Sequence, residues 1–268
     1  DQSLSEAFAH SCNVAFGQLA AELGGETLQR YAEKAGLTAS YSVSTVDTAR
    51  GRFDLTGLDE GQLAWSGVGQ GNDLVNPCAM MVWMGAIANG GKAAVPYYAE
   101  RTVDFLGIPH SLHHSAKTDR LVSADTAARL TELMANNVDV TYGASRFPNM
   151  DLCAKSGTAE VGDGKSPHAW FVGFLRNEDA PYAFAVLVEN GGGGSSGRQG
   201  AGPHRQRLLR KPPAGGEKER FHGKILPLQH PGHPPGADRL GSRHRGLLPA
   251  LRREGAGGRH RRGAGALH

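Results

Sequence analysis

The sequence predicts an α+β domain in which a layer of helices precedes an antiparallel sheet. Two observations predict this class: apolar residues recur at helical spacing as far as Val138, and the pattern then changes to short β-rich runs from Leu152 onward. The 268 residues are enough to bury a core. No apolar run approaches 18 residues and Asp1 does not open a signal peptide, so we expect no signal or membrane anchor in this chain.

Capping residues mark the predicted helices. Ser3 and Glu6 form a capping-box pattern at the start of an apolar stripe that Gly24-Gly25 ends and Ser11-Cys12-Asn13 interrupts. Three more helices are predicted: from Thr27 to Gly36, from Asn76-Pro77 to Asn89, and from Ser123 to Val138.

Three consecutive antiparallel strands are predicted after the helices. They are rich in β-forming residues and separated by the turn sequences Gly162-Asp163-Gly164 and Asn177-Glu178-Asp179. The strands are expected over Leu152 to Glu160, Ala169 to Arg176 and Ala183 to Asn190.

The charge is divided between two different parts of the chain. Residues 1–190 hold 13 basic and 22 acidic residues, and the other 78 hold 16 basic and 4 acidic ones. The second part also contains half of the 38 glycines, and Phe221 is its one aromatic residue. It shows no sustained period of 2 or 3.6, so we expect it to be disordered.

The three cysteines do not suggest a metal site. They are sparse, odd in number and without C-x-x-C spacing, which argues against both a disulfide framework and a zinc site. We expect Cys12, Cys78 and Cys153 to be small buried hydrophobes.

The tetrapeptide Lys155-Ser156-Gly157-Thr158 lies within the first predicted strand. A glycine weakens strand packing and usually marks close approach of a ligand or another backbone. A cation, two hydroxyls and bare backbone suit a carboxylate-bearing substrate laid alongside as an added strand. The alternative is a solvent-exposed lysine in an ordinary strand.

Ser11-x-Asn13 places a hydroxyl and an amide where the first helical stripe is interrupted. A hydroxyl can relay a proton, and an amide can hold a substrate carbonyl. The alternative is a serine that merely caps a helix.

The order of the motifs resembles the transpeptidase domain of penicillin-binding proteins, most nearly the class B type. The matching segments are Ser11 to Phe16, Gly69-Gln70-Gly71-Asn72 followed by Pro77, and Lys155 to Glu160 followed by Pro167 to Phe174. The resemblance covers residues 1–193. It implies a partial fold of the penicillin-binding-protein and β-lactamase type, with a helical layer and an antiparallel sheet.

The resemblance also implies roles for individual residues. Ser11 matches the serine that passes a proton to the departing amine. Asn13 matches the asparagine whose amide holds the acyl side chain. Lys155 matches the lysine whose charge helps to set the electrostatic field of the site. Ser156 stands where the family more often has threonine, and it keeps the hydroxyl group. Gly157 leaves room for the ligand. Thr158 matches the residue that meets the substrate carboxylate and lends its N–H to the oxyanion hole. The segment Gly69 to Asn72 would belong to the scaffold beside the cleft, or would be an ordinary glycine turn before a helix.

The implied function is peptidoglycan D,D-transpeptidation. The family acts on D-Ala-D-Ala stem peptides with the cell-wall synthesis machinery of division or cell shape, at the extracytoplasmic face of the bacterial membrane. It is acylated by β-lactams and needs no metal or organic cofactor. The alternatives are a non-catalytic protein that binds peptidoglycan or β-lactams, and a relative of the serine β-lactamases or D,D-carboxypeptidases.

The family's first motif, Ser-x-x-Lys, is absent from the sequence, because no serine has a lysine three positions on. In the family this motif precedes Ser-x-Asn by some tens of residues, and only ten residues precede Ser11. We therefore expect residues 1–193 to be a truncated, inactive transpeptidase domain, from a truncated reading frame or a natural pseudoenzyme.

Residues 194–268 are expected to be a low-complexity basic tail. The family continues here with a long helix that covers the sheet, whereas this tail has the Arg, Gly, Pro, His and Ala enrichment of a GC-rich gene translated out of frame. We predict a frameshift near codons 192 to 200. The alternative is a genuine basic tail for nucleic acid or anionic lipid, but the lack of interleaved aromatics argues against nucleic acid.

Without the helix that covers the sheet in the family, an apolar sheet face with Phe171, Phe174 and Phe184 is expected to be exposed.

Overall fold

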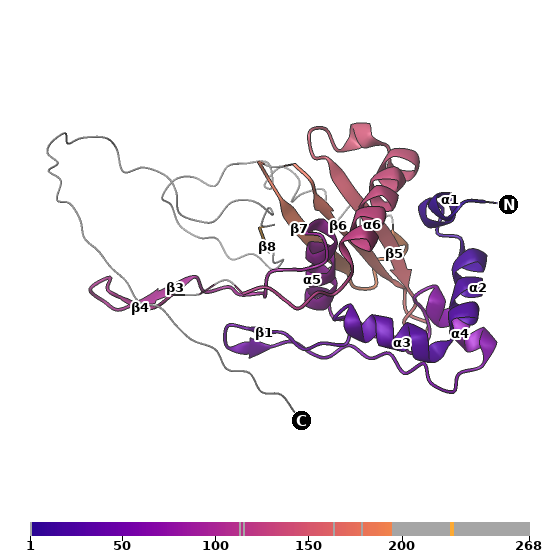
Figure 1. The fold of residues 1–268 in the computed structure, drawn as a ribbon, viewed down its shortest axis with the longest axis horizontal. Coiled ribbons are helices and arrows are strands. Elements are labelled where there is room, and N and C mark those ends of the chain that lie inside the picture. The colour runs from indigo at the N-terminus through magenta and orange to yellow at the C-terminus, as the bar shows by residue number, and fades with distance from the viewer. Residues whose placement is uncertain are drawn as a thin grey trace, which may run out of the picture. The chain divides into compact units, whose positions relative to one another are not determined.

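The computed structural model describes residues 2–112, 114, 116–162, 164–177, 179–194 and 226–227, all within one compact unit, Asp1–Pro231. It confirms the α+β class, with helices before the main sheet (Figure 1). The helices are α1 (Leu4–Ala9), α2 (Asn13–Leu23), α3 (Gly25–Lys34), α4 (Glu60–Gly67), α5 (Pro77–Ala88) and α6 (Ala124–Asn137), followed by the π turn η1 (Val138–Tyr142) and the 3-10 turn η2 (Ala144–Arg146).

The main sheet contains the three predicted strands, β5 (Leu152–Ala159), β6 (His168–Leu175) and β7 (Tyr182–Val188), all antiparallel. The two-residue strand β8 (Leu226–Pro227) pairs with β7 at its other edge. Apart from this pair and Gly194, the expected disordered and frameshifted tail lies outside the described residues. Among the described strands, β5 is therefore an edge strand of the sheet.

Both faces of the sheet are covered, so the expected exposed apolar face is wrong. Phe174 packs with Met84 of α5 and Met134 of α6 on one face. On the other face, Phe171 packs in a cluster that includes Tyr142 of η1. Phe171 and Phe174 are each 1% exposed, and Phe184 is also buried. The segment after α6 therefore covers the face for which the sequence offered no partner.

Most helix ends follow the predicted caps. The Ser3–Glu6 capping box forms, and the side chains of Asn76 and Ser123 cap α5 and α6. Helix α3 begins at Gly25, two residues before the predicted Thr27. Neither α4 nor two hairpins were predicted from the sequence. The hairpins are β1 (Ser42–Val43) with β2 (Val46–Asp47), and β3 (Arg101–Val103) with β4 (Pro109–Leu112).

The β3–β4 hairpin has an ordered turn with an apolar tip and extends away from the main sheet (Figure 1). The carboxylate Oδ1 of Asp104 accepts hydrogen bonds from the backbone N–H groups of Leu106 (2.8 Å) and Ile108 (2.9 Å). Phe105 at the tip is 95% exposed. The hairpin tip therefore contributes nothing to the core that positions the sheet.

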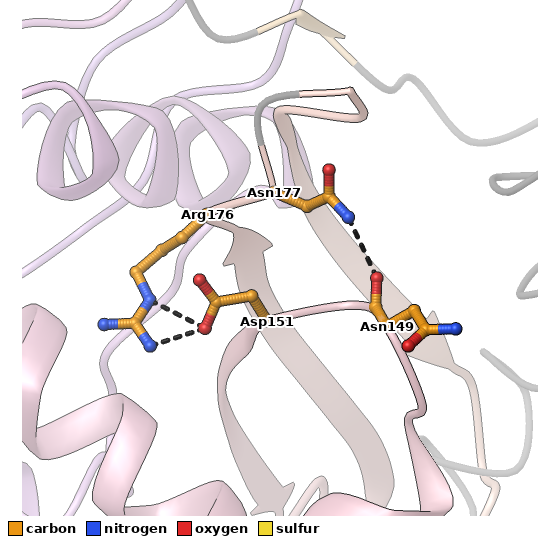
Figure 2. Close-up of polar contacts among 4 residues, drawn as sticks. All are labelled: Asn149, Asp151, Arg176 and Asn177. Atoms are coloured by element: carbon orange, nitrogen blue, oxygen red, sulfur yellow. Dashed lines mark hydrogen bonds and ion pairs between the residues drawn. The ribbon is translucent and has the colours of Figure 1, made fainter.

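Polar contacts join the start of β5 to the end of β6 (Figure 2). The Arg176 guanidinium donates to Asp151 Oδ1 from Nε (3.1 Å) and Nη2 (2.5 Å), and Asn177 Nδ2 donates to the Asn149 carbonyl (2.9 Å). Asn149 and Asp151 have φ of 62° and 43°, in the left-handed region. These contacts support the register that places Lys155 opposite Val172.

The prediction of three buried cysteines is correct only for Cys153, which is fully buried. Cys12 and Cys78 are partly exposed, because Cys12 precedes the first turn of α2 and Cys78 lies in the first turn of α5. None of the three forms a disulfide. Within the described part of the chain, no helix has the length and apolar character to cross a bilayer.

Candidate active site

Ser11 lies at the junction of α1 and α2 in an unusual backbone conformation. Its φ is 52°, in the left-handed region that non-glycine residues adopt at a cost. The Ser11 N–H donates to the Phe8 carbonyl (3.3 Å) and the Cys12 N–H to the Ala7 carbonyl (2.9 Å), which ends α1. The predicted interruption of the helical stripe is therefore a tight turn that presents the Ser11 hydroxyl.

The structure brings Ser11 and Lys155 together. Lys155 Nζ donates to Ser11 Oγ (2.5 Å) and to the Ser156 carbonyl (3.0 Å). The same ammonium lies 6.0 Å from the centre of the Phe8 ring, within the range of a cation–π contact. The two motifs therefore meet through their hydroxyl and ammonium groups.

Helix α6 and the turn after it join the two motifs. Asn136 Nδ2 donates to Ser5 Oγ (2.9 Å), and Thr141 Oγ1 donates to the Ala9 carbonyl (3.0 Å), which ties α6 to α1. On the opposite side, the fully buried Asn137 donates from Nδ2 to the Ala154 carbonyl of β5 (2.7 Å). The α6 segment therefore fixes the relative position of Ser11 and Lys155.

Tyr142 holds Ser156. Its hydroxyl accepts from the Ser156 N–H (2.6 Å) and lies 3.0 Å from Ser156 Oγ. Its ring is buried edge-on against Phe171, with centroids 5.8 Å apart. Tyr142 ends the π turn after α6, and such turns often occur at functional sites. No sequence pattern marked it, because the contact depends on this irregular turn.

The other predicted site residues lie around this pair. Asn13 is the exposed first residue of α2. A Cβ added at Gly157 would lie 3.6 Å from Trp170 Cβ, an ordinary contact, so packing within the described protein does not require glycine there. Thr158 is exposed, and its Oγ1 accepts from the Gly194 N–H (2.8 Å).

Gln70 of the Gly69 to Asn72 segment contacts the end of β5. Its Nε2 donates to the Thr158 carbonyl (2.7 Å), and its Oε1 accepts from the Glu160 N–H (3.1 Å). Gly69 and Gly71 have φ of 80° and 83°, which glycine adopts without strain. Of the two interpretations of this segment, the structure supports a scaffold that lies against the Lys155 strand.

The two cysteines next to the motifs differ in acidity. The Ala15 backbone N–H and the Gln2 side chain lower the pKa of the Cys12 thiol, beside Ser11. Burial raises the pKa of the Cys153 thiol to about 11. Among the residues that the structure describes, no three His, Cys, Asp or Glu side chains are arranged to hold a metal ion.

The chain is similar in sequence to known proteins. Residues 1–211 match the family model described as the penicillin binding protein transpeptidase domain. The peptidoglycan D,D-transpeptidase PbpA of Mycolicibacterium smegmatis is 34% identical over 206 residues, which is 74% of this chain and 41% of that protein. PbpA of Mycobacterium tuberculosis is 33% identical over 204 residues, with the same two coverages. The chain therefore spans less than half the length of these curated relatives.

Solved structures show the same fold. The crystal structure of PBPA from Mycobacterium tuberculosis has a TM-score of 0.70 and 31% identity, over 77% of this chain and 51% of that one. Its ceftriaxone acyl-enzyme complex has a TM-score of 0.71 and 31% identity, over 78% and 48%. The chain belongs to the penicillin-binding protein transpeptidase family.

Proposed function

We propose that this chain supplies the Ser-x-Asn and Lys-Ser-Gly motifs of a peptidoglycan D,D-transpeptidase site and binds acyl-D-Ala-D-Ala stem peptides. The observation that supports this most directly is the contact between Lys155 Nζ and Ser11 Oγ. A cation beside a hydroxyl on an edge strand suits a ligand that ends in a carboxylate.

Each residue has a role that follows from its chemistry. The Lys155 ammonium attracts the terminal carboxylate and polarises the Ser11 hydroxyl, which can then pass a proton to a departing amine. Asn13 holds the acyl side chain through its amide. These three residues are the proposed catalytic groups of the site.

Ser156, Gly157 and Thr158 are the proposed substrate-binding residues on β5. The Ser156 and Thr158 hydroxyls offer polar contacts to the carboxylate, and the absence of a side chain at Gly157 lets the ligand approach the backbone. In this proposal the Thr158 N–H stabilises a carbonyl oxygen that becomes negative in the transition state.

We further propose that the 268-residue polypeptide binds its ligands without forming a covalent bond. Acylation needs a serine activated by a base, and the sequence contains no Ser-x-x-Lys. In this proposal residues 1–193 are the transpeptidase domain and residues 194–268 are an appended basic tail that takes no part in the site.

The setting and partners are proposed from the family. The relatives are named peptidoglycan D,D-transpeptidases, and one of them is solved with ceftriaxone attached as an acyl-enzyme. We propose that this chain works on the extracytoplasmic face of the bacterial cell membrane, with peptidoglycan stem peptides, β-lactams and the cell-wall synthesis machinery as partners.

A second candidate function is that of a non-catalytic binding protein for peptidoglycan or β-lactams. The lack of Ser-x-x-Lys beside an assembled Ser11–Lys155 pair favours it for the polypeptide as it stands. A serine β-lactamase or D,D-carboxypeptidase function would require acylation and then hydrolysis, and it is the alternative if the 268-residue polypeptide is acylated.

Two measurements on the full chain test the proposal. Saturation-transfer NMR with an acylated D-Ala-D-Ala peptide is expected to show binding that Lys155→Ala abolishes and Lys165→Ala preserves. Incubation with a fluorescent penicillin, followed by denaturing electrophoresis, is expected to give no labelled band. Equal binding by both lysine variants would refute the site, and a labelled band that maps to one serine would refute the non-covalent assignment.

A further inference from the structure

We infer that Gln70 is a positioning residue that occupies the edge of β5 beyond Thr158, in place of a neighbouring strand, and so fixes how far a bound peptide can extend along β5. The part of this inference that concerns the peptide rests on the proposed function. The edge contact itself does not.

The outward backbone groups of β5 belong to its even-numbered residues. In an antiparallel pair, the N–H and C=O of one residue point to the same side of the strand. The Ala154 carbonyl, the Ser156 N–H and the Thr158 carbonyl all bond to side chains rather than to β6. The Thr158 N–H therefore also points outward, away from the Ala169 of β6 that lies opposite.

Side chains from α6, from η1 and from β5 itself occupy most of this edge. Asn137 donates to the Ala154 carbonyl, and Tyr142 accepts from the Ser156 N–H. The Lys155 ammonium donates to the Ser156 carbonyl. An exposed strand edge is a template for pairing with another chain, so these contacts restrict where a peptide can add.

Gln70 occupies the two outward groups that follow the Thr158 N–H. Its Nε2 donates to the Thr158 carbonyl and its Oε1 accepts from the Glu160 N–H, at 2.7 and 3.1 Å. A carboxamide has both a donor and an acceptor, so it can match the two groups that a strand would pair with. Neither a carboxylate nor a hydrocarbon side chain of this length could make both bonds.

The loop that holds Gln70 is fixed by contacts of its own. The Gln70 N–H donates to the Trp65 carbonyl (3.1 Å) and the Gly69 N–H to the Ser66 carbonyl (2.8 Å), at the end of α4. The Ser66 hydroxyl donates to the Asp73 carboxylate beyond the loop. Gln70 therefore lies in a loop whose two ends are both held by hydrogen bonds.

One outward group remains between Tyr142 and Gln70. No partner of the Thr158 N–H is found within the described ranges, whereas the Thr158 carbonyl is already bound to Gln70. A bound peptide can thus place one acceptor oxygen at the Thr158 N–H, and to continue along the strand to the Glu160 N–H it must displace Gln70. Gln70 would therefore limit how far the ligand extends along β5, and it would not contact the reacting atoms.

Hydrogen exchange in the ligand-free chain tests the edge contact. Gln70→Ala is expected to speed exchange of the Glu160 amide at least tenfold and to leave the Ser156 amide, held by Tyr142, unchanged. Gln70→Glu keeps an acceptor for Glu160 and is expected to retain most of that protection. The matched control is Gln18→Ala, an exposed glutamine of α2. Equal exchange at Glu160 in the wild type and in Gln70→Ala would overturn the inference.

Titration with an acylated D-Ala-D-Ala peptide tests the limit on the ligand. In the wild type we expect the Thr158 amide resonance to shift and the Glu160 amide to stay unchanged, and in Gln70→Ala we expect both to shift. A Glu160 shift of equal size in both proteins would overturn the inference. If Glu160 exchange depends on Gln70 but the peptide shifts nothing in either protein, the proposed function has failed and the edge contact stands.

Discussion

Lys155 Nζ donates a hydrogen bond to Ser11 Oγ across 2.5 Å, although 144 positions separate the two residues in the chain. The contact exists because α6 is bonded to both sides. Asn136 binds Ser5 of α1, and Asn137, the next residue, binds Ala154 of β5. Two adjacent asparagines on one helix thus hold the two motifs at a fixed separation.

The first prediction concerns Lys155 in a chain that also contains a nucleophile. Joined to an upstream segment that carries the family's Ser-x-x-Lys motif, the chain should be acylated by penicillin, and Lys155→Ala should lower the second-order rate constant about 10- to 100-fold. A hydrogen bond to a charged group is worth about 1.5–3 kcal/mol, which sets this range. The exposed Lys165 lies in the turn after β5 and is the matched control. Similar losses from both substitutions would mean that the strand motif is misplaced.

The second prediction concerns the backbone of Ser11. Because its φ is 52°, Ser11→Gly should leave the protein about 1 kcal/mol more stable than Ser11→Ala, since only glycine adopts this conformation without a steric cost. Both substitutions remove the hydroxyl that Lys155 contacts. Urea unfolding of the two variants measures the difference, and equal midpoints would show that the left-handed turn is not strained.

The third prediction separates the core from the hairpin tip. Phe171→Ala should lower the free energy of unfolding by about 3–5 kcal/mol, because the ring is buried among Tyr142, Phe147 and Phe184. Phe105→Ala should change it by less than about 0.5 kcal/mol, because that ring is 95% exposed. Comparable losses in thermal or urea unfolding would show that the hairpin packs against something, contrary to the structure.

The fourth prediction concerns thiol reactivity. The pKa of Cys12 is lowered and that of Cys153 is raised to about 11, so the reactive thiolate forms at lower pH for Cys12 and scarcely at all for folded Cys153 at pH 8. Iodoacetamide at pH 8 should therefore modify Cys12 first, and Cys153 only after unfolding. Mass spectrometry of tryptic peptides measures both rates. Faster modification of Cys153 in the native protein would contradict the placement of β5.

Short-range patterns were enough to predict most of the fold. The Ser3–Glu6 capping box, the Asn76-Pro77 start of α5 and the three strands from Leu152 follow from residues close in sequence, and the structure confirms them. Helix α4 was missed because its eight residues include little apolar sequence, although Asp59 and Gln62 form a capping box that marks its start.

The candidate site could be predicted only in part. Motif spacing identified Ser11 and Lys155, and the structure places them in contact. Tyr142, Asn137 and Gln70 could not be found in this way, because each contacts β5 from a distant segment whose direction depends on the tertiary fold. The sheet face that contains Phe171 was wrongly predicted to be exposed for the same reason. The residues of η1 that cover it are brought there by the tertiary fold.

The central claim is that Ser11, Asn13 and the Lys155 strand form one binding site for an acylated D-Ala-D-Ala peptide. The most direct test is a titration of the isotopically labelled full chain with this peptide, followed through its backbone amide resonances. We predict that the shifts concentrate at Ser11, Asn13 and residues 155–158, with the largest at the Thr158 amide, and that Lys155→Ala abolishes them. Shifts confined to residues outside both motifs, or unchanged in Lys155→Ala, would contradict the account.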